Sequence, residues 1–202
     1  MEVGEKVKAF LGRKSKEEVL GGIRLLDVKS KKNPVLSHST TTSRVDEILN
    51  EGLISHGFAN RIGKTDHVET EQMGSGGAPH YPNIWFKVGP VAMLDFAVLV
   101  PSNHGVFDRE GRSVENVQAF WARDVIVHHR VAPGEFTGFL VKKNELLEEI
   151  AQKLQKSMNK NGVTLPIYDQ NGDLVWPTRM SHREIVRMLA QRQKQPHSRV
   201  EP

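Results

Sequence analysis

The stretch LSHSTTTSRVDEILNEGLIS (36–55) carries the residues best suited to binding an anionic ligand. His38 stands in a predicted strand and is followed by Ser39 and Thr40, and then by a predicted helix whose first backbone amides lack partners within the helix. An imidazole can bond to a ribose hydroxyl, and the hydroxyl and backbone groups of Ser39 and Thr40 can reach a ring amide. The pattern favours a polyhydroxylated, anionic ligand, and a capped turn with a hydrogen-bonded histidine is the alternative.

Three segments of the chain, taken together, resemble the motifs of ADP-ribosyltransferase-like domains. HSTTTSRVDEILNEGLIS (38–55) resembles the first motif, a His-x-Ser/Thr followed by a helix of the pattern x-x-Ile-Leu-x-x-Gly-Leu. NIWFKVGP (83–90) resembles the second, a strand with an aromatic residue that stacks on nicotinamide. RDVIVHHRVAPGEFTGFLV (123–141) resembles the last, in which an acid opens a strand and a Val-x-Pro-x-x-Phe/Ile sequence follows. The resemblance covers about residues 36–141 and lies nearest in style to the toxins that modify nucleic acid.

The resemblance implies an α+β fold with a split β-sheet core and flanking helices. It also implies that NAD is the substrate, and that ADP-ribose is transferred to a macromolecular acceptor, with nucleic acid as one option. Asp124 would hold the place of the catalytic acid, and His38 would bind the ribose on the adenosine side. Ser39 and Thr40 would also contact the cofactor. Trp85 or Phe86 would stack on nicotinamide.

The sequence departs from the family's pattern at each of these motifs. Ser39 stands where the family usually has glycine, and Trp85 or Phe86 stands where it often has tyrosine. Asp124 is one methylene shorter than the family's glutamate. The departures leave room for a domain of the same fold that binds a nucleotide or RNA without catalysis.

The acid itself has more than one candidate. Glu115 is the second candidate and Gln118 is a further rival, because the stretch 112–121 lies just upstream and could form the loop that faces the substrate. Asp124 could instead be an edge-strand carboxylate paired with Arg123 or Arg130. A third function, an RNA-directed phosphotransferase or nuclease, would use His38 as acid and base or to position a phosphate, as suggested by the related RNA 2′-phosphotransferases.

The transfer reaction explains why a carboxylate is needed. Cleavage of the bond between nicotinamide and ribose produces an oxocarbenium-like sugar, so a carboxylate near the ribose stabilises the transition state and can orient the acceptor. Residues 55–82 lack periodicity and are rich in glycine and proline, which predicts a long loop, with 56–82 able to close over the cofactor. A toxin would also need an antidote protein as partner.

The histidines do not predict a metal site. On a continuous strand over 121–131, His128 and His129 would point to opposite faces and could not bind one ion together. The histidines of the long loop have no tight His-x-x-x-His spacing, and GSGGAP (74–79) lacks the Lys-Ser/Thr of a phosphate-binding loop. We therefore expect no metal, and NAD as the cofactor.

The net charge of +4 is concentrated at the two ends of the chain. Residues 1–32 hold nine Lys/Arg against five Asp/Glu, and residues 179–202 hold six against two, so each end is +4. The middle, 33–178, holds 13 against 17 and is −4. Basic ends of this kind are typical of solvated helix faces, and the alternative is contact with nucleic acid.

Composition excludes several classes of chemistry. The chain has no cysteine, which excludes disulfides, thiolate metal sites and cysteine nucleophiles. No run approaches the ~18 apolar residues of a membrane span, and the N-terminus, MEVGEKVKAF, lacks the apolar core of a secretory signal. We therefore expect a cytoplasmic protein without a membrane partner.

Apolar periodicity and turn residues predict the elements that must position these side chains. The expected helices are the first thirty residues, the stretch from a Ser43 cap to Gly52, the stretch from Asn144 to Gly162, and a basic helix capped by Ser181 and Glu184. The expected strands are 35–39, 83–88, 92–100, 121–131 and 136–141, followed by a hairpin at 165–177 with a type I′ turn at Asn171-Gly172. The predicted units are an N-terminal helical segment (1–32), a core (33–162) and a C-terminal hairpin with its basic helix (163–202).

Overall fold

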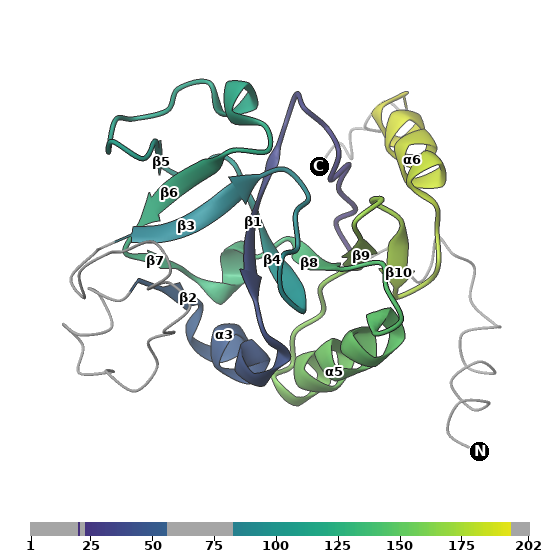
Figure 1. The fold of residues 1–202 in the computed structure, drawn as a ribbon. Coiled ribbons are helices and arrows are strands. Elements are labelled where there is room, and N and C mark those ends of the chain that lie inside the picture. Colours follow the sequence, from purple (N-terminus) through teal and green to yellow (C-terminus); the bar gives the residue numbers. More distant parts are fainter. Residues whose placement is uncertain (1–19, 21–22, 56–82, 195–202) are drawn as a thin grey trace, which may run out of the picture.

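The computed structural model describes residues 20, 23–55 and 83–194 of the 202-residue chain. These residues form an eight-stranded sheet in the order β10-β9-β8-β4-β1-β3-β6-β5, with helices packed against it (Figure 1). The paired strands are antiparallel except β8 and β9, which run parallel. A second, two-stranded sheet joins β2 to β7. The expected α+β class is confirmed.

The described residues form the following elements in chain order. The strands are β1 (Val35–Thr40), β2 (Leu53–Ile54), β3 (Asn83–Val88), β4 (Phe96–Pro101), β5 (Val106–Phe107), β6 (Asp124–His128), β7 (Arg130–Val131), β8 (Gly138–Val141), β9 (Ile167–Asp169) and β10 (Leu174–Trp176). The α-helices are α3 (Val45–Glu51), α5 (Leu147–Lys160) and α6 (His182–Lys194), and the 3-10 turns are η1 (Thr42–Arg44), η4 (Val117–Phe120) and η5 (Pro133–Glu135).

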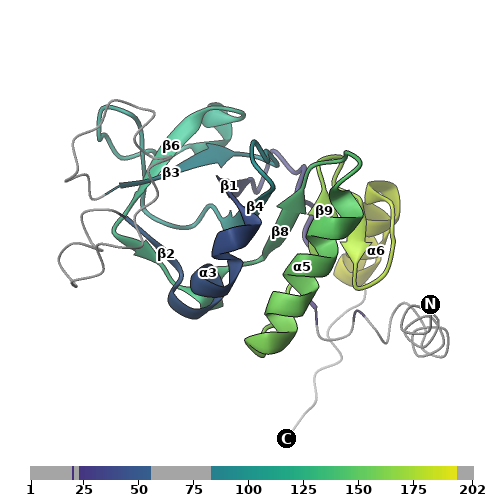
Figure 2. The ribbon, with the colours of Figure 1, turned by 60° about the horizontal axis from the view of Figure 1, so that its bottom comes forward.

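One face of the sheet packs on α3 and α5, which lie side by side (Figure 2). Strand alternation sends Leu36 and Phe86 to this face, and both are buried in the larger apolar cluster. On α5, the residues predicted to form the inner face, Ile150, Ala151 and Leu154, are buried in the same cluster. The helical periodicity at 147–158 therefore predicted both the helix and its buried side.

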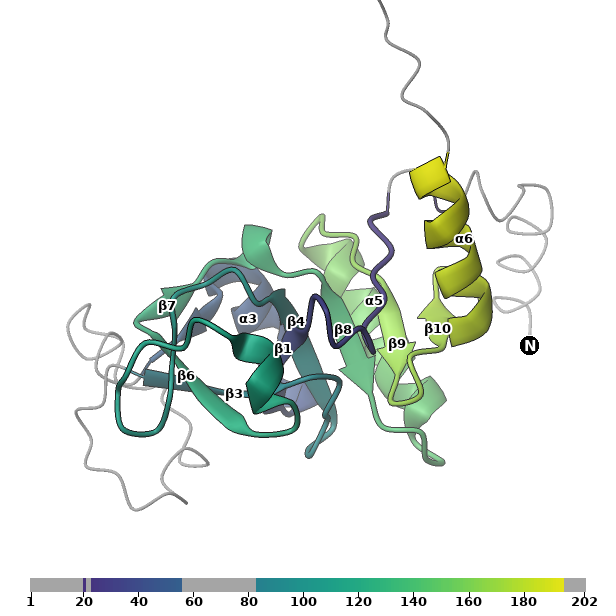
Figure 3. The ribbon, with the colours of Figure 1, turned by 90° about the horizontal axis from the view of Figure 1, so that it is seen from above.

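The other face packs, at the β8–β10 end of the sheet, on α6 and on residues of the N-terminal segment. Tyr168 is fully buried there, and its hydroxyl accepts a hydrogen bond from the amide of Leu26 at 3.2 Å. Burial raises the pKa of Tyr168 to about 12. Figure 3 shows α6 beyond β10, at this end of the molecule. The C-terminal hairpin continues the sheet of the core, because its first strand, β9, pairs with β8.

Several predicted elements are confirmed, including the Ser181 cap. The amide and hydroxyl of Ser181 both donate to Glu184 Oε2, at 2.9 and 2.8 Å, and the amide of Glu184 donates back to Ser181 Oγ. Helix α3 ends at Gly52 as expected, with φ 88°. A Cβ at Gly52 would lie 2.2 Å from the carbonyl oxygen of Val131, so this close approach requires glycine.

Other predictions about the elements are wrong. Ser43 does not cap α3, because it lies in the turn η1 and the helix begins at Val45. The strand expected from residue 92 begins only at Phe96, since Asp95 instead accepts hydrogen bonds from the amide and hydroxyl of Thr42. The tight turn at Asn171 is a longer loop, whose amides bond to a side-chain oxygen of Asp169, and of its two central residues only Gly172 has a positive φ.

Two long predicted elements are also interrupted. The expected strand 121–131 breaks at His129, whose φ of 66° ends β6 and starts β7 in a different direction. The helix expected over the first thirty residues does not extend through 23–30, where the chain forms turns and the amide of Leu26 bonds to Tyr168. Residues 1–19 and 56–82, the latter predicted to form a long loop, lie outside the described residues, so these parts of the prediction stay untested.

Candidate functional site

Strands β3, β5 and β6 place three rows of side chains on one face of the sheet. The printed register pairs Lys87 with Asp124, Trp85 with Ile126, and Asn83 with His128. Phe107 of β5 pairs with Ile126 on the other side. Because alternate residues of a strand share a face, all these side chains point the same way. We call them the charged row (Lys87, Asp124 and, from the loop after β5, Arg109), the apolar row (Trp85, Ile126, Phe107) and the polar row (Asn83, His128).

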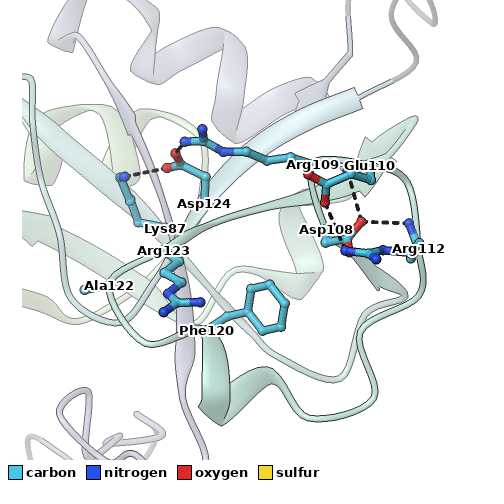
Figure 4. Close-up of a pocket in the computed structure, with 9 residues that line it drawn as sticks. All are labelled: Lys87, Asp108, Arg109, Glu110, Arg112, Phe120, Ala122, Arg123 and Asp124. Carbon is cyan, nitrogen blue, oxygen red and sulfur yellow. Dashed lines mark hydrogen bonds and ion pairs between the residues drawn. The ribbon is translucent and has the colours of Figure 1, made fainter.

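In the charged row, one carboxylate is held between two cations. The Lys87 Nζ lies 2.5 Å from Asp124 Oδ1, and the Arg109 guanidinium contacts Asp124 Oδ2 (Figure 4). Partial burial acts to raise the pKa of Asp124, but the hydrogen bonds and charges of Lys87 and Arg109 outweigh it and lower that pKa below its ordinary value. Asp124 is therefore an ionised carboxylate at neutral pH.

The two partners anticipated for Asp124 are not the ones it has. Arg130 donates from Nη2 to the carbonyl oxygen of Glu51 at 2.7 Å instead. Arg123 lines the same cavity as Asp124 but forms no ion pair within the described part of the chain. Lys87 faces Asp124 across the ladder between β3 and β6, and this register brings Lys87 to the carboxylate.

A cavity of about 460 Å³ opens beside the charged row. Its charged lining contains four cations and three carboxylates: Lys87, Arg109, Arg112, Arg123, Asp108, Glu110 and Asp124. In the close-up, Arg109 reaches over from the loop to Asp124, while Arg123 and Phe120 lie together on another side (Figure 4). The cavity is thus open to an anionic ligand that can share the cations with Asp124.

The loop that carries Arg109 is fixed by a buried carboxylate at its base. Asp108 Oδ1 accepts hydrogen bonds from the amides of Glu110 and Arg112, at 3.0 and 2.8 Å, and Asp108 Oδ2 accepts one from Arg112 Nε at 2.7 Å. Burial acts to raise the pKa of Asp108, but the bonds from Arg112 and Glu110 lower it below the ordinary value. Arg109 projects from this fixed turn with a side chain that is 64% exposed.

The apolar row lies next to the cavity. The Arg109 guanidinium carbon lies 5.9 Å from the centre of the Trp85 ring, within the range of a cation–π contact. Ile126 is buried between its neighbours, and Trp85 and Phe107 are only partly buried. An aromatic ring of a ligand could therefore reach Trp85 while its anionic group contacts Arg109.

His38 lies on the opposite face of the sheet from Asp124. Ser37 pairs with Lys87, and Lys87 pairs with Asp124, so the residue after Ser37 points to the other face. His38 is 8% exposed, and its ring centre lies 5.6 Å from that of Phe86. Its Nδ1 donates to the backbone oxygen of Trp85 at 2.8 Å, because a carbonyl can only accept. The structure therefore brings Trp85 and Asp124 together on one face of the sheet and places His38 on the opposite face.

The remaining predicted site residues are spread over the two faces. Phe86 is buried in the core, so of the two aromatic candidates only Trp85 lies on the face of Asp124. Thr40 is fully buried, and Ser39 Oγ accepts the amide of Met93 at 2.9 Å. Glu115 is exposed in the loop before η4 and does not line the cavity.

Lys87, Arg109 and Asn83 are functional candidates that the sequence analysis missed. Lys87 stands in the segment that resembles the second motif, and its alternation with Trp85 was readable from the sequence. The pairing of β3 with β6 was not, since the two strands are joined by about 35 residues that include β4 and β5. Arg109 carries no motif, and only the fold brings it to Asp124.

Comparisons with protein-family models, curated proteins and solved structures found no match to this chain. Within the described ranges, no group of three or more His, Asp or Glu side chains is placed to hold a metal ion. No helix among those residues is both long and apolar enough to cross a bilayer. The charged and apolar rows offer cations and an accessible aromatic ring, which would suit a ligand that combines an anionic group with an aromatic ring.

Proposed function

We propose that this chain binds NAD on the face formed by Trp85, Lys87 and Asp124, and transfers ADP-ribose from it to a macromolecular acceptor. The proposal includes an ADP-ribosyltransferase-like core. The three segments that carry the resemblance lie on β1, β3 and β6, which are neighbours in the sheet, and this adjacency supports their forming one site. The observation that carries the proposal is the ion-paired Asp124 beside an accessible tryptophan ring.

The charged row supplies what a pyrophosphate needs. Arginine binds phosphate oxygens through a planar fork, and lysine adds a compact positive charge. Arg109 is 64% exposed in its side chain, so it can turn from Asp124 to a phosphate without disturbing the core. Arg123 adds a cation at the same cavity. Binding of the pyrophosphate would draw positive charge away from Asp124 and leave its carboxylate available.

The apolar row supplies a surface for a flat ring. The nicotinamide ring of NAD would stack on Trp85, as the resemblance assigns to this strand, while Arg109 remains within reach of the phosphates. Stacking places the glycosidic bond near the charged row, because Trp85 and Lys87 are alternate residues on one strand face.

Asp124 would act as the electrostatic group of the reaction. As the bond from ribose to nicotinamide breaks, positive charge develops on the sugar, and an ionised carboxylate next to it stabilises the transition state. A carboxylate whose pKa is lowered stays ionised at neutral pH, which this role requires. His38 would act as a positioning residue, since its hydrogen bond holds the backbone of Trp85 rather than the ligand.

A binding measurement tests the proposed site before any acceptor is known. Isothermal titration of NAD into the full chain should give a saturable signal, and Trp85→Ala and Lys87→Met should each weaken it at least tenfold. Lys160→Met is the matched control, because Lys160 pairs with Asp46 on α3, away from this face. Absence of binding at millimolar NAD, or equal affinity in wild type and Lys87→Met, would refute the site.

One observation favours a second function, a non-catalytic domain that binds a nucleotide or RNA. Asp124 is neutralised by two cations, and a carboxylate in that state can serve to hold Lys87 and Arg109 in place for a phosphate. This function predicts NAD or RNA binding without nicotinamide release. The RNA phosphotransferase hypothesis gains no such support, because His38 is buried on the face of the sheet that carries the larger apolar cluster.

A further inference from the structure

His128 and His129 lie beside the proposed ligand face but take no part in the function argued above. On an unbroken strand their side chains would point to opposite faces of the sheet. The left-handed backbone of His129, with φ 66°, breaks the alternation, and the two ring centres lie 5.9 Å apart. The amide of Ser55 donates to the carbonyl oxygen of His129 at 2.8 Å, which anchors this conformation.

The separation of the rings fits a shared metal ion. Two imidazoles on a tetrahedral zinc, with Zn–N bonds of about 2.0–2.1 Å, have ring centres about 5.2 Å apart. The 5.9 Å between His128 and His129 differs from that value by less than about 1 Å, which small side-chain rotations can supply. His129 is exposed and His128 is half-buried, so an ion can reach both from solvent.

A hydrogen bond orients the ring of His128 in the way that is usual for a metal-binding histidine. Its Nδ1 lies 2.7 Å from Asn83 Oδ1 and donates to it, because an amide oxygen only accepts. This fixes the tautomer and leaves the lone pair on Nε2 free for a metal. Metal-binding histidines almost always donate their other ring N–H in this way. Phe107, whose ring centre lies 4.1 Å from that of His128, restrains the ring further.

We propose that His128 and His129 form a two-histidine site for a divalent transition-metal ion, with Asn83 as the positioning residue of His128. Imidazole nitrogens suit Cu²⁺, Ni²⁺ and Zn²⁺, and affinity should follow the order Cu²⁺ above Ni²⁺ and Zn²⁺. Water would fill the other coordination positions. The site is separate from the charged row, because His128 lies four residues along β6 from Asp124, about 13 Å at 3.3 Å per residue.

The test is a titration of the full chain with Ni²⁺ alone, read by calorimetry. The wild type should bind one ion at this site, and His128→Ala and His129→Ala should each lower that affinity at least tenfold. Asn83→Ala should lower it about 10-fold or more while both ligands remain, as loss of such a supporting hydrogen bond does in known sites. His104→Ala is the matched control and should bind as the wild type does.

A spectrum separates this site from the other histidines of the chain. The wild type with one equivalent of Cu²⁺ should show the hyperfine pattern of imidazole nitrogens in its electron paramagnetic resonance spectrum, and the His128→Ala, His129→Ala double variant should lose it. Retention of the same affinity and spectrum by the folded double variant, as judged by its circular dichroism, would overturn the proposal. So would an absence of Ni²⁺ binding at millimolar concentration.

Discussion

The Lys87 Nζ lies 2.5 Å from Asp124 Oδ1, across the ladder that joins β3 to β6. This pair links two of the segments that carry the resemblance, and it is completed by Arg109 from a loop that carries none of it. Lys87 and Arg109 both hold the Asp124 carboxylate in position and lower its pKa. It also supplies the cations that a phosphate-bearing ligand would share.

Removal of Lys87 should change the titration of Asp124. In Lys87→Met, the carboxylate loses one of the two cations that lower its pKa, so that pKa should rise towards the ordinary aspartate value. The measurement is an NMR titration of the side-chain carboxyl carbon of Asp124 in both proteins. Lys160→Met is the control, because it should instead shift Asp46. An unchanged Asp124 titration would contradict the described geometry.

Three carboxylates whose pKa values are lowered make the free energy of unfolding depend on pH in acid. The pKa values of Asp124, Asp108 and Asp46 are lowered in the folded chain, so each contributes stability that is fully present above the unfolded pKa of about 3.9. That stability is lost as the pH falls through the lowered folded values. The free energy of unfolding, measured by urea titration, should therefore decrease as the pH falls below about 4.

The share of Asp124 in this decrease can be isolated. Asp124→Asn should show a smaller drop in the free energy of unfolding over that pH range, because one lowered carboxylate is gone. Glu115→Gln is a suitable control, since Glu115 is exposed and forms no ion pair in the described part of the chain. An equal pH slope in wild type and Asp124→Asn would show that Asp124 is not held by Lys87 and Arg109.

Trp85 should carry the aromatic part of ligand recognition. Trp85→Ala should weaken nucleotide binding at least tenfold, by about 1.4–3 kcal/mol, which lies within the range found for loss of base stacking, whereas Trp85→Phe should retain most of the affinity. Trp121→Ala is the matched control, because that ring lies 5.7 Å from Lys31 Nζ and does not line the cavity. Quenching of tryptophan fluorescence by NAD should disappear in Trp85→Ala and persist in Trp121→Ala. The reverse pattern would show that NAD binds to another surface of the protein.

Gly52 gives a test of the fold around the site. Gly52→Ala should lower the free energy of unfolding by more than about 2 kcal/mol, because it combines a left-handed backbone with a Cβ 2.2 Å from Val131 O. Gly111→Ala separates the two costs, since Gly111 has φ 79° and no atom within 4 Å of an added Cβ. That variant should lose only about 1–2 kcal/mol. Equal losses in chemical denaturation would mean that the close approach at Gly52 is absent.

Local patterns predicted local structure well in this chain. The apolar spacing on α5, the Ser181 and Glu184 cap and the strand at 83–88 all have the predicted form, because each depends on residues close in sequence. The residue that ends α3 was also readable, since glycine supports the φ of 88° found at Gly52.

The composition of the site was less predictable because it depends on strand pairing. Alternation along β3 puts Trp85 and Phe86 on opposite faces of the sheet. Only the register shows that Trp85 shares its face with Asp124, and that His38 lies on the other face. The break at His129 could not be read either, since a positive φ is uncommon for residues other than glycine and no glycine stands at the position. Both the shared faces and the break at His129 depend on contacts between segments that lie far apart in the sequence.

The release of nicotinamide from NAD, measured by chromatography under single-turnover conditions, tests the central proposal most directly. The wild-type chain, supplied with single-stranded and double-stranded nucleic acid and with protein as acceptors, should release nicotinamide. Asp124→Asn should be slower by about 100-fold or more, as expected for loss of a group that stabilises charge in the transition state. Asp46→Asn, which removes an ion-paired carboxylate elsewhere, should keep the wild-type rate. Equal rates in wild type and Asp124→Asn, or no release by wild type while NAD is bound, would contradict catalysis at Asp124.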